Sequence, residues 1–242
     1  MSDHDPVTSM SEWHRARMHH DGLALTTDRL VIRDWSVDDA EAALHVYGAP
    51  EVTRWLMPAM RPVPDADRMR TILRAWRDAQ PALAPPRGRW AVQRRFDGQV
   101  IGGLAIRPLP ASTGDLQLAW QLNPRQWGQG YATEAARALI NWAFAYDIPQ
   151  LSAVARPANV RSIATAERLG MRWTDTVNYD GLQMRLYRIR RDDLPEWRRN
   201  DPLTATPSVP QHAPGHGSSP DTAALELPRT PFNASVKLGR MG

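Results

Sequence analysis

The sequence predicts a mixed α+β domain in which a mostly antiparallel sheet is flanked by helices. Two strand-like runs, residues 89–95 and 99–107, are joined at Asp97-Gly98, which is a strong signal for a β-hairpin. Residues 131–146 form the clearest amphipathic helix pattern, with one unbroken apolar stripe. A strand, a helix and a last hairpin follow this helix, so we expect a parallel βαβ unit beside the antiparallel strands.

The elements before the first hairpin begin with a strand at residues 29–33. Ser36 and Asp39 then match a capping box, which predicts a helix that continues to about residue 47. A second helix is predicted at residues 65–79, because apolar side chains recur there at helical spacing. These side chains are Met69, Ile72, Leu73 and Trp76.

The elements after the first hairpin are a third antiparallel strand, the amphipathic helix, a strand, a second helix and a final hairpin. They cover residues 115–122, 131–146, 151–155, 160–169, 171–177 and 182–190. The third strand ends cleanly because Pro124 favours an extended conformation at Asn123. Gly170 ends the second helix, since glycine is preferred just past a helix C-terminus.

The chain divides into three parts by composition. Residues 1–22 form an N-terminal extension, with a weak helix candidate at residues 11–18. Residues 23–200 hold all the strong patterns and form the predicted domain. Residues 201–242 form a tail rich in proline and serine that lacks a sustained hydrophobic period. We expect most of this tail to be disordered, because it cannot bury enough apolar surface to offset its ordering entropy.

The composition excludes several classes of protein. There is no cysteine, so disulfide scaffolds, thiolate metal sites and thiol nucleophiles are ruled out. No spaced set of metal ligands stands out, and we expect no metal. The start of the sequence lacks a basic-then-apolar leader, and no apolar stretch is long enough to cross a bilayer. The sequence therefore predicts a cytoplasmic protein that does not associate with a membrane.

The charge of the chain favours an anionic small ligand over a nucleic acid. Of the 30 basic residues only Lys237 is a lysine. Residues 23–200 carry 25 basic and 19 acidic residues, a surplus that suits an anionic partner. The basic residues are dispersed and form no continuous run, so the pattern is not that of a nucleic-acid interface.

A glycine turn lies between the strand at 115–122 and the helix at 131–146. Gly128 and Gly130 allow a tight turn whose backbone amides converge, and the positive end of the helix faces the same point. This arrangement is suited to phosphate groups, and Arg125 can add a charge-assisted contact. The turn lacks the Gly-Lys-Ser/Thr of a Walker A loop. Two glycines at such a turn also occur where no ligand binds.

The residues of this turn match a known pattern. Arg125-x-x-Gly128-x-Gly130, followed by Tyr-Ala-Thr-Glu-Ala at 131–135, resembles the acetyl-CoA diphosphate loop of the GNAT N-acetyltransferase superfamily. Asn159-x-x-Ser162, followed by Arg-Leu-Gly-Met at 168–171, resembles the next motif of that superfamily. The resemblance implies acetyl-CoA as co-substrate and the absence of a metal.

Two further segments look most like the RimJ/RimL-type branch of the superfamily, which acetylates protein N-termini. They are residues 27–33 and 120–132. The resemblance covers about residues 23–196 and implies the fold of that superfamily. In this fold the strands at 115–122 and 151–155 splay apart and form the acetyl-CoA cleft.

The resemblance also implies which residues bind the co-substrate. Free backbone groups of residues 121–123 are expected to bond the pantetheine arm, and amides of residues 127–132 to take the diphosphate. The assigned residues are Gln121, Leu122, Asn123, Arg125, Trp127, Gly128, Gln129, Gly130, Tyr131, Ala132, Asn159 and Ser162.

The implied reaction is direct transfer of the acetyl group to a primary amine. Many relatives carry a glutamate, proposed as the base, where this sequence has Gln117, and a glutamine cannot take a proton. Asp115 is one alternative base, and a neutral amine that loses its proton to water is another. Ser162 matches a position proposed to protonate the departing thiolate, although it would also suit an ordinary first turn of a helix.

The acceptor and the assembly stay open at this point. The N-terminal amine of a ribosomal or other protein is one acceptor, and a small amine such as an antibiotic or polyamine is another. A polyamine would favour an acidic cleft near the thioester, and the candidate acids are Asp34, Asp38, Asp39 and Glu51. Gln117 also suggests a CoA-binding sensor with little turnover. The protein is expected to be a monomer or a homodimer.

Overall fold

The computed structural model describes residues 17–19, 22–109, 114–179 and 181–194. Nine strands in these residues form one sheet in the order β1-β2-β3-β4-β5-β6-β7-β9-β8. The strands are β1 Arg17–His19, β2 Gly22–Thr26, β3 Leu30–Asp34, β4 Gly88–Arg94, β5 Val100–Pro108, β6 Leu116–Leu122, β7 Gln150–Ala155, β8 Arg172–Tyr179 and β9 Leu182–Arg190. The helices are α1 Ala40–Tyr47, α2 Pro50–Thr53, α3 Ala66–Ala79, α4 Tyr131–Ala143 and α5 Val160–Arg168.

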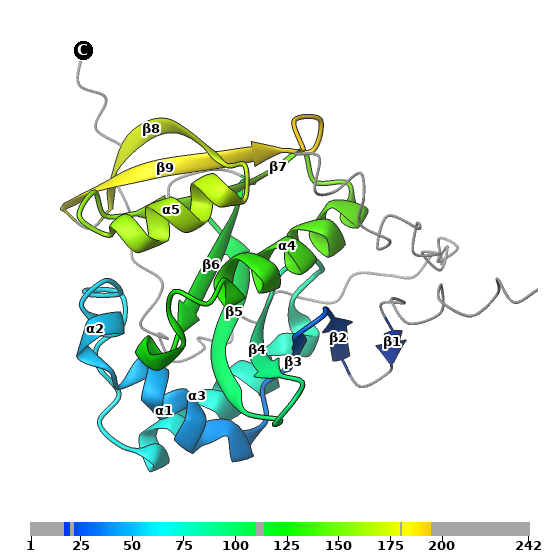
Figure 1. Ribbon diagram of the computed structural model, residues 1–242, viewed down its shortest axis with the longest axis vertical. Coiled ribbons are helices and arrows are strands. Elements are labelled where there is room, and N and C mark those ends of the chain that lie inside the picture. Colours follow the sequence, from blue (N-terminus) through cyan, green and yellow to red (C-terminus); the bar gives the residue numbers. More distant parts are fainter. Residues whose placement is uncertain (1–16, 20–21, 110–113, 180, 195–242) are drawn as a thin grey trace, which may run out of the picture.

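The mixed α+β fold predicted from the sequence is confirmed (Figure 1). Neighbouring strands are antiparallel except β6 and β7, which are parallel and are connected through α4. The hairpin predicted at Asp97-Gly98 joins β4 to β5, and Gly98 has a φ of +71° there. Such a value is easy only for glycine, which explains why this residue stands at the turn.

The predicted helix ends are also present. The side chains of Ser36 and Asp39 form the capping box, and a short 3-10 turn, Val37–Asp39, precedes α1. Asp65 caps α3, since its Oδ1 accepts a hydrogen bond from the N–H of Arg68 at 2.7 Å. Gly170, which follows α5, has a φ of +84°, the left-handed conformation that ends many helices.

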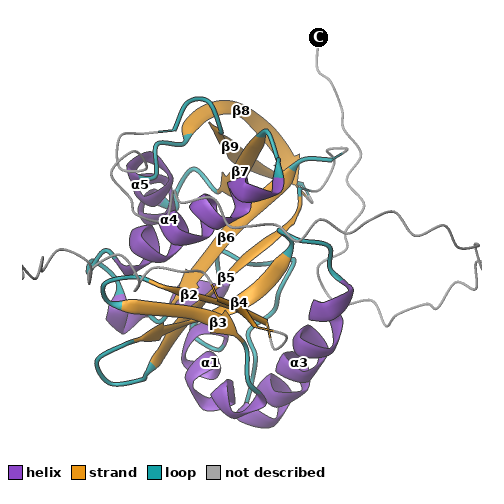
Figure 2. Cartoon of the chain, turned by 90° about the vertical axis from the view of Figure 1, so that its right-hand side faces the viewer, coloured by secondary structure: helices purple, strands orange, loops and turns teal. Residues whose placement is uncertain are grey.

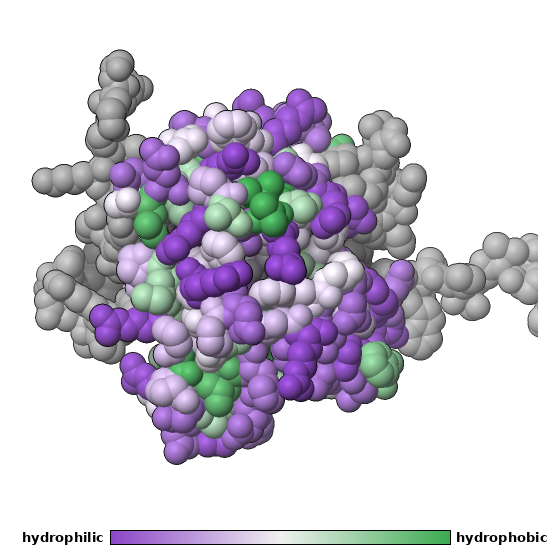
Figure 3. All heavy atoms as spheres, turned by 60° about the vertical axis from the view of Figure 1, so that its left-hand side comes forward, coloured by the Kyte–Doolittle hydropathy of each residue, from purple (hydrophilic) through white to green (hydrophobic). Residues whose placement is uncertain are grey.

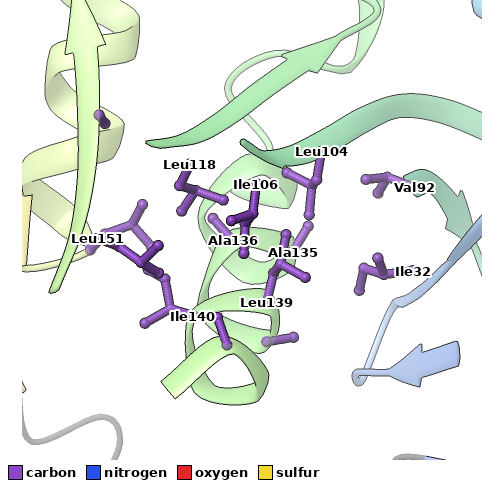
Figure 4. Close-up of a cluster of buried hydrophobic side chains, with 14 of the residues drawn as sticks. Ile32, Val92, Leu104, Ile106, Leu118, Ala135, Ala136, Leu139, Ile140 and Leu151 are labelled. Carbon is purple, nitrogen blue, oxygen red and sulfur yellow. The ribbon is translucent and has the colours of Figure 1, made fainter. Parts of the chain in front are cut away.

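Helices cover both faces of the sheet, with α4 on one side and α1 and α3 on the other (Figure 2). A buried cluster of side chains lies on each side. On one face the apolar side of α4 packs onto the central strands, and Figure 4 shows Leu139 and Ile140 of the helix among the strand side chains. Leu139, Ile140 and Leu118 of β6 are at most 1% exposed. Each buried aliphatic side chain of this size contributes about 1.5–3 kcal/mol. This packing fixes the first turn of α4 relative to the sheet.

The second cluster joins α1 and α3 to the opposite face of the sheet. Its buried members include Val46 of α1, Met69 and Leu73 of α3, and Trp35. The side chains of Trp35, Tyr47 and Trp76 also contact one another through tilted and edge-on ring pairs. The helix pattern predicted at residues 65–79 is therefore accounted for by burial.

Three elements were not predicted from the sequence, namely β1, β2 and the short helix α2. The helix candidate at residues 11–18 is wrong for Arg17 and Met18, which lie in β1, and its other residues lie outside the described part. The tail at 201–242 also lies outside the described residues. The helix predicted at 131–146 ends earlier, at Ala143, and continues as a 3-10 turn, Phe144–Tyr146.

No helix in the described ranges is both long enough and apolar enough to cross a bilayer. On the face shown in Figure 3, hydrophobic residues form separate patches among hydrophilic ones. Scattered apolar patches of this kind are normal on protein surfaces.

Candidate active site

The site begins where β6 and β7 separate. In the described residues the two strands pair at one position, with Gln117 opposite Ser152. In contrast, β6 is paired with β5 along its whole length, from Leu116 to Leu122. The strands therefore diverge beyond Gln117, and the predicted splay is confirmed.

The backbone groups that face this opening differ from those expected. The N–H of Asn123 donates to the carbonyl of Ile101 at 2.9 Å. Residues that bond across an antiparallel ladder alternate along the strand, so the backbone groups of Gln121 also turn toward β5. Contrary to the expectation, the backbone groups of Gln121 and Asn123 are therefore not free to bond a ligand. The same alternation turns the backbone of Trp120 and Leu122 toward the opening.

The glycine turn leads directly from this opening into α4. Gly128 and Gly130 both have a φ of +81°, and no side chain caps the helix. The first intrahelical bond runs from the N–H of Glu134 to the carbonyl of Gly130 at 3.0 Å. The N–H groups of residues 131–133 therefore have no partner within the helix and converge with the positive end of its dipole.

The space in front of the turn is open. A Cβ placed on Gly128 would meet no atom within 4 Å, and one on Gly130 would meet only the Arg29 side chain at 3.5 Å. Open space beside uncapped amides is what a phosphate ligand requires. The residues present therefore fit the diphosphate of acetyl-CoA.

A network of hydrogen bonds holds the turn against the sheet. Glu134 of α4 accepts bonds from the Thr27 hydroxyl at 2.6 Å and from the Arg29 backbone at 3.0 Å, and its ion pair with the Arg29 side chain is 2.6 Å long. The Arg29 guanidinium also donates to the carbonyl of Gln129 at 3.1 Å and lies 4.6 Å from the Tyr131 ring centre. We call Thr27, Arg29 and Glu134 the loop clamp.

Trp127 anchors the other side of the turn. Its indole N–H donates to the carbonyl of Leu122 at 2.9 Å, and its ring packs against both buried clusters. The Arg161 guanidinium of α5 lies 5.1 Å from the centre of the same ring. Trp127 therefore ties the turn to the end of β6 and to α5.

A cavity of about 970 Å³ joins the opening to the glycine turn. This volume is in the range of small-molecule and cofactor sites. Most of the site residues predicted from the sequence line it, and these are Gln117, Gln121, Leu122, Trp127, Gly128, Gly130, Tyr131, Ala132, Asn159 and Ser162. Four others, Asp115, Asn123, Arg125 and Gln129, do not line it.

The three candidate catalytic residues occupy different environments. Gln117 is 3% exposed and lines the cavity, and its Oε1 has no hydrogen-bond partner among the described residues. Ser162 also lines the cavity, and its N–H donates to Asn159 Oδ1 at 3.3 Å, so Asn159 caps α5. Asp115 accepts a bond from Gln150 at 2.9 Å and lies 3.7 Å from the Arg188 guanidinium. These contacts hold Asp115 at the sheet rather than in the cavity lining.

Several lining residues were not found from the sequence. Arg107 of β5 stands opposite Gln117 across the ladder, a position set by strand register alone. Trp55 and Met57 follow α2, and the Arg156 guanidinium reaches from the end of β7 to the carbonyl of Met57. Only the aromatic character of Trp55 offered a signal, and it suits a buried position equally well.

The charge of the cavity is positive. Its described lining includes five arginines and no aspartate or glutamate. Desolvation lowers the pKa of Arg107 to about 10, and the positive charge of Arg89 adds to this effect. Burial also lowers the pKa of Arg89 and raises that of the neighbouring Tyr47. Within the described residues, no group of His, Asp and Glu is arranged to hold a metal.

The sequence was compared with protein families and with known proteins, and it matches one family model and several relatives. Residues 29–172, more than half of the chain, match the model of the acetyltransferase (GNAT) domain. N-acetyltransferase p20 of Bacillus licheniformis, itself uncharacterized, is 26% identical over 140 residues, which are 57% of this chain and 76% of that protein.

Two solved structures share the fold. One is a candidate ribosomal-protein-serine acetyltransferase from Vibrio cholerae, with a TM-score of 0.56 and 22% identity over 69% of this chain and 97% of that one. The other is Mycobacterium smegmatis RimJ in complex with CoA-disulfide, with a TM-score of 0.56 and 19% identity over 72% of this chain and 85% of that one. At these identities the likeness is one of fold.

Proposed function

The chain belongs to the GNAT acetyltransferase family, and from this premise we propose that it acetylates the N-terminal amine of a protein. That it is an acetyltransferase follows from the family, which uses acetyl-CoA. The N-terminal acceptor is supported by the RimJ/RimL-like segments of the sequence and by the two structural neighbours. The single observation that carries the acetyl-CoA site, on which the proposal depends, is the set of uncapped amides of α4 at the opening between β6 and β7.

We propose that acetyl-CoA lies along this opening. The N–H groups of residues 131–133 take the diphosphate, and the outward-facing backbone of Trp120 and the N–H of Leu122 bond the pantetheine arm, since the Leu122 carbonyl already accepts a bond from the Trp127 indole. Each charge interaction at a helix end is worth about 0.3–1 kcal/mol, so several converging amides are needed for useful affinity. Arg161 of α5 lines the cavity beside Trp127 of the turn and adds positive charge for the phosphates.

The reaction we propose needs no enzyme nucleophile. A neutral amine attacks the thioester carbonyl, a C–N bond forms, the C–S bond breaks and the CoA thiolate leaves. The proton lost by the amine passes to water, and the thiolate gains a proton from the Ser162 hydroxyl or from solvent. Backbone N–H groups at the open edge of β6 face the place where the oxyanion forms, and one well-placed donor can contribute about 2.7–4 kcal/mol.

Gln117 positions the amine or a water in this scheme. Its buried Oε1 can accept one hydrogen bond from either, because it has no partner among the described residues. The Gln117 side chain cannot remove the proton of the amine. This favours a second candidate function, that of a CoA-binding protein with little turnover. A polyamine acceptor has less support, since Asp34, Asp38, Asp39 and Glu51 do not line the cavity.

The proposed cofactor site is tested by Gly130→Glu. This change puts bulk and negative charge in front of the uncapped amides, so we expect acetyl-CoA to lose its stabilising effect in thermal unfolding. The matched control is Gly98→Glu, because Gly98 also has a positive φ and also has only one side-chain atom at 3.5 Å from an added Cβ. Equal acetyl-CoA responses in the two variants would contradict the assignment.

Turnover is tested by release of free CoA with peptides and small amines as acceptors. The chain has no cysteine, so a thiol reagent reports CoA alone. We expect CoA to be released with peptides that have a free N-terminus and not with N-acetylated copies of the same peptides. Binding of acetyl-CoA without release on any amine would favour the CoA-binding protein of little turnover.

A further inference from the structure

Four large apolar side chains of the cavity lining lie outside both hydrophobic cores. They are Trp55, Met57, Leu182 and Met184. Among the described residues, none of the four belongs to a buried cluster or packs against one. Met57 is 44% exposed, and the other three are partly buried. Core packing therefore does not explain why these positions are apolar, and we call the four residues the apolar group.

Strand register places the β9 members of the apolar group on the same face of the sheet as Gln117. Gln117 pairs with Ser152 of β7, so their side chains share a face. Side chains alternate along a strand, so Val154 lies on this face too, together with its β9 partner Leu186. Met184 is two residues before Leu186, and the same alternation places it there.

The members that follow α2 are brought to this place by a hydrogen bond. The Arg156 guanidinium donates to the carbonyl of Met57. Arg156 directly follows β7, whose last pair with β9 is Ala155 with Arg185, so Met184 is the next residue on β9. One arginine therefore lies beside both Met57 and Met184. Figure 1 shows α2 and the start of β9 on the same side of the molecule, at the left.

The charged half of acetyl-CoA, as we place it, does not occupy this part of the cavity. The diphosphate lies at the first turn of α4. Leu118, the neighbour of Gln117 on β6, packs in the cluster that contains the side chains of α4 and α5, so Gln117 points to the opposite face of the sheet. An acceptor that puts its amine at Gln117 therefore lies on the face where the apolar group is.

We infer that the acceptor peptide has a large apolar side chain within its first three residues, and that this side chain packs against the apolar group. The inference rests on the proposed function and names the class of substrate for the same site. Ser152, opposite Gln117, is four residues before Arg156, which is about 13 Å of extended strand. An extended peptide advances about 3.3 Å per residue, so a long side chain on one of its first three residues reaches the apolar group from an amine at Gln117.

The charges beside the apolar group disfavour a basic side chain and do not require an acidic one. The Arg54 guanidinium lies 4.6 Å from the ring centre of Trp55, and that of Arg156 bonds the carbonyl of Met57. Both guanidinium groups therefore have a partner already, and both would repel a lysine or an arginine. An apolar side chain instead gains by removing its own surface and that of the apolar group from water.

The test uses three peptides that are alike except at their first three positions, which are all Leu, all Asn or all Asp. Leu and Asn have nearly the same shape, so this pair isolates apolar character. CoA release gives kcat/KM for each peptide. For the unaltered protein we expect the Leu peptide to exceed the Asn peptide by about 10-fold or more, as for the burial of one such side chain, and the Asp peptide to be no better than the Asn peptide.

The outcomes of this test separate the inference from the proposed function. Equal values for the three peptides, or the highest value for the Asp peptide, would overturn the inference and leave the proposed function standing. No release from any of the three would overturn both.

Two substitutions locate the preference at the apolar group. Met57→Gln and Met184→Gln keep the length of the side chain and make it polar, so the ratio of kcat/KM between the Leu and Asn peptides should fall about 3-fold or more in each. Met184→Leu should keep the ratio. The control is Phe96→Gln, since Phe96 is 78% exposed and does not line the cavity. A ratio that survives in both glutamine variants overturns the inference.

Thermal unfolding shows whether these variants keep the fold and the co-substrate site. Met57 and Met184 lie outside both buried clusters, so acetyl-CoA should stabilise both glutamine variants as much as it stabilises the unaltered protein. Loss of this response in both variants would mean that the two residues serve the fold or the acetyl-CoA site, and the inference would be wrong.

Discussion

Gln117 is a buried amide at the position where β6 and β7 pair. Its Oε1 is buried without a partner in the described residues, and a group of this kind costs about 1–3 kcal/mol in stability. Ser152, the residue opposite on β7, also has a buried hydroxyl oxygen without a described partner. Two such groups side by side at the point where the strands diverge favour a polar guest there, such as water or the acceptor amine.

The role of Gln117 predicts opposite effects for two substitutions. Gln117→Glu supplies a group that can take the proton of the amine, and we expect kcat above neutral pH to rise by about 10-fold or more. The pH profile should then gain an ionisation that the unaltered protein lacks. Gln117→Leu removes the hydrogen-bond acceptor and should lower kcat without lowering the unfolding temperature.

The control for this pair is Gln183→Glu, an exposed position on β9. It should leave both kcat and the pH profile unchanged. If Gln117→Leu turns over as fast as the unaltered protein, Gln117 neither holds the amine nor a water.

Among single residues, sequence reasoning found the cavity-lining residues of the glycine turn and of α5 more fully than those around Arg107. Gly128, Gly130 and Asn159 belong to short local patterns, and local patterns can be read directly from a sequence. Arg107 faces Gln117 because of the register between β5 and β6, and register depends on contacts between segments. No local signal marks such a residue.

At the level of elements, α4 depends on the loop clamp for its position. Glu134 lies in its first turn, where an acidic residue is favoured by the helix dipole, yet its bonds run to Thr27 and Arg29, which precede β3. The clamp therefore connects the start of the sheet to the amides that face the opening. None of its three residues lines the cavity, so we expect it to hold those amides in place without contacting the ligand.

Breaking the clamp should weaken acetyl-CoA binding without abolishing it. In Glu134→Gln the charged bond to Arg29 is lost, which we expect to cost about 1 kcal/mol, or about 5-fold in the Kd for acetyl-CoA. Titration calorimetry measures this change. Glu167→Gln, at an exposed position of α5, is the matched control and should leave Kd unchanged. An unchanged Kd in Glu134→Gln would mean that the clamp does not position the turn.

Elements with strong local signals were predicted and short ones were not. The apolar stripes of α3 and α4 and the hairpin at Gly98 are present as expected. The four residues of α2 make about one helical turn, too short to show a period. The strand β2 has only five residues, and it is recognised as a strand only through its pairing with β3.

For the whole molecule, one prediction concerns the tail at residues 201–242. Among the described residues, both buried clusters are built from residues between Leu23 and Ile189, with Leu194 packed against one of them. We therefore predict that a chain ending at residue 200 keeps its unfolding temperature within about 2 °C. It should also keep its stabilisation by acetyl-CoA, which is about 2.7 kcal/mol at a concentration 100 times Kd. Loss of either property would show that residues 201–242 contribute to the fold or the site.

The opening between β6 and β7 also has a mechanical consequence. It divides the sheet into two parts, β1–β6 and β7–β9, that pair at a single position within the described residues. If acetyl-CoA binds as we propose, its pantetheine arm adds hydrogen bonds along the edge of β6 that faces β7. We then expect the two parts of the sheet to move less relative to each other in the bound protein than in the free one.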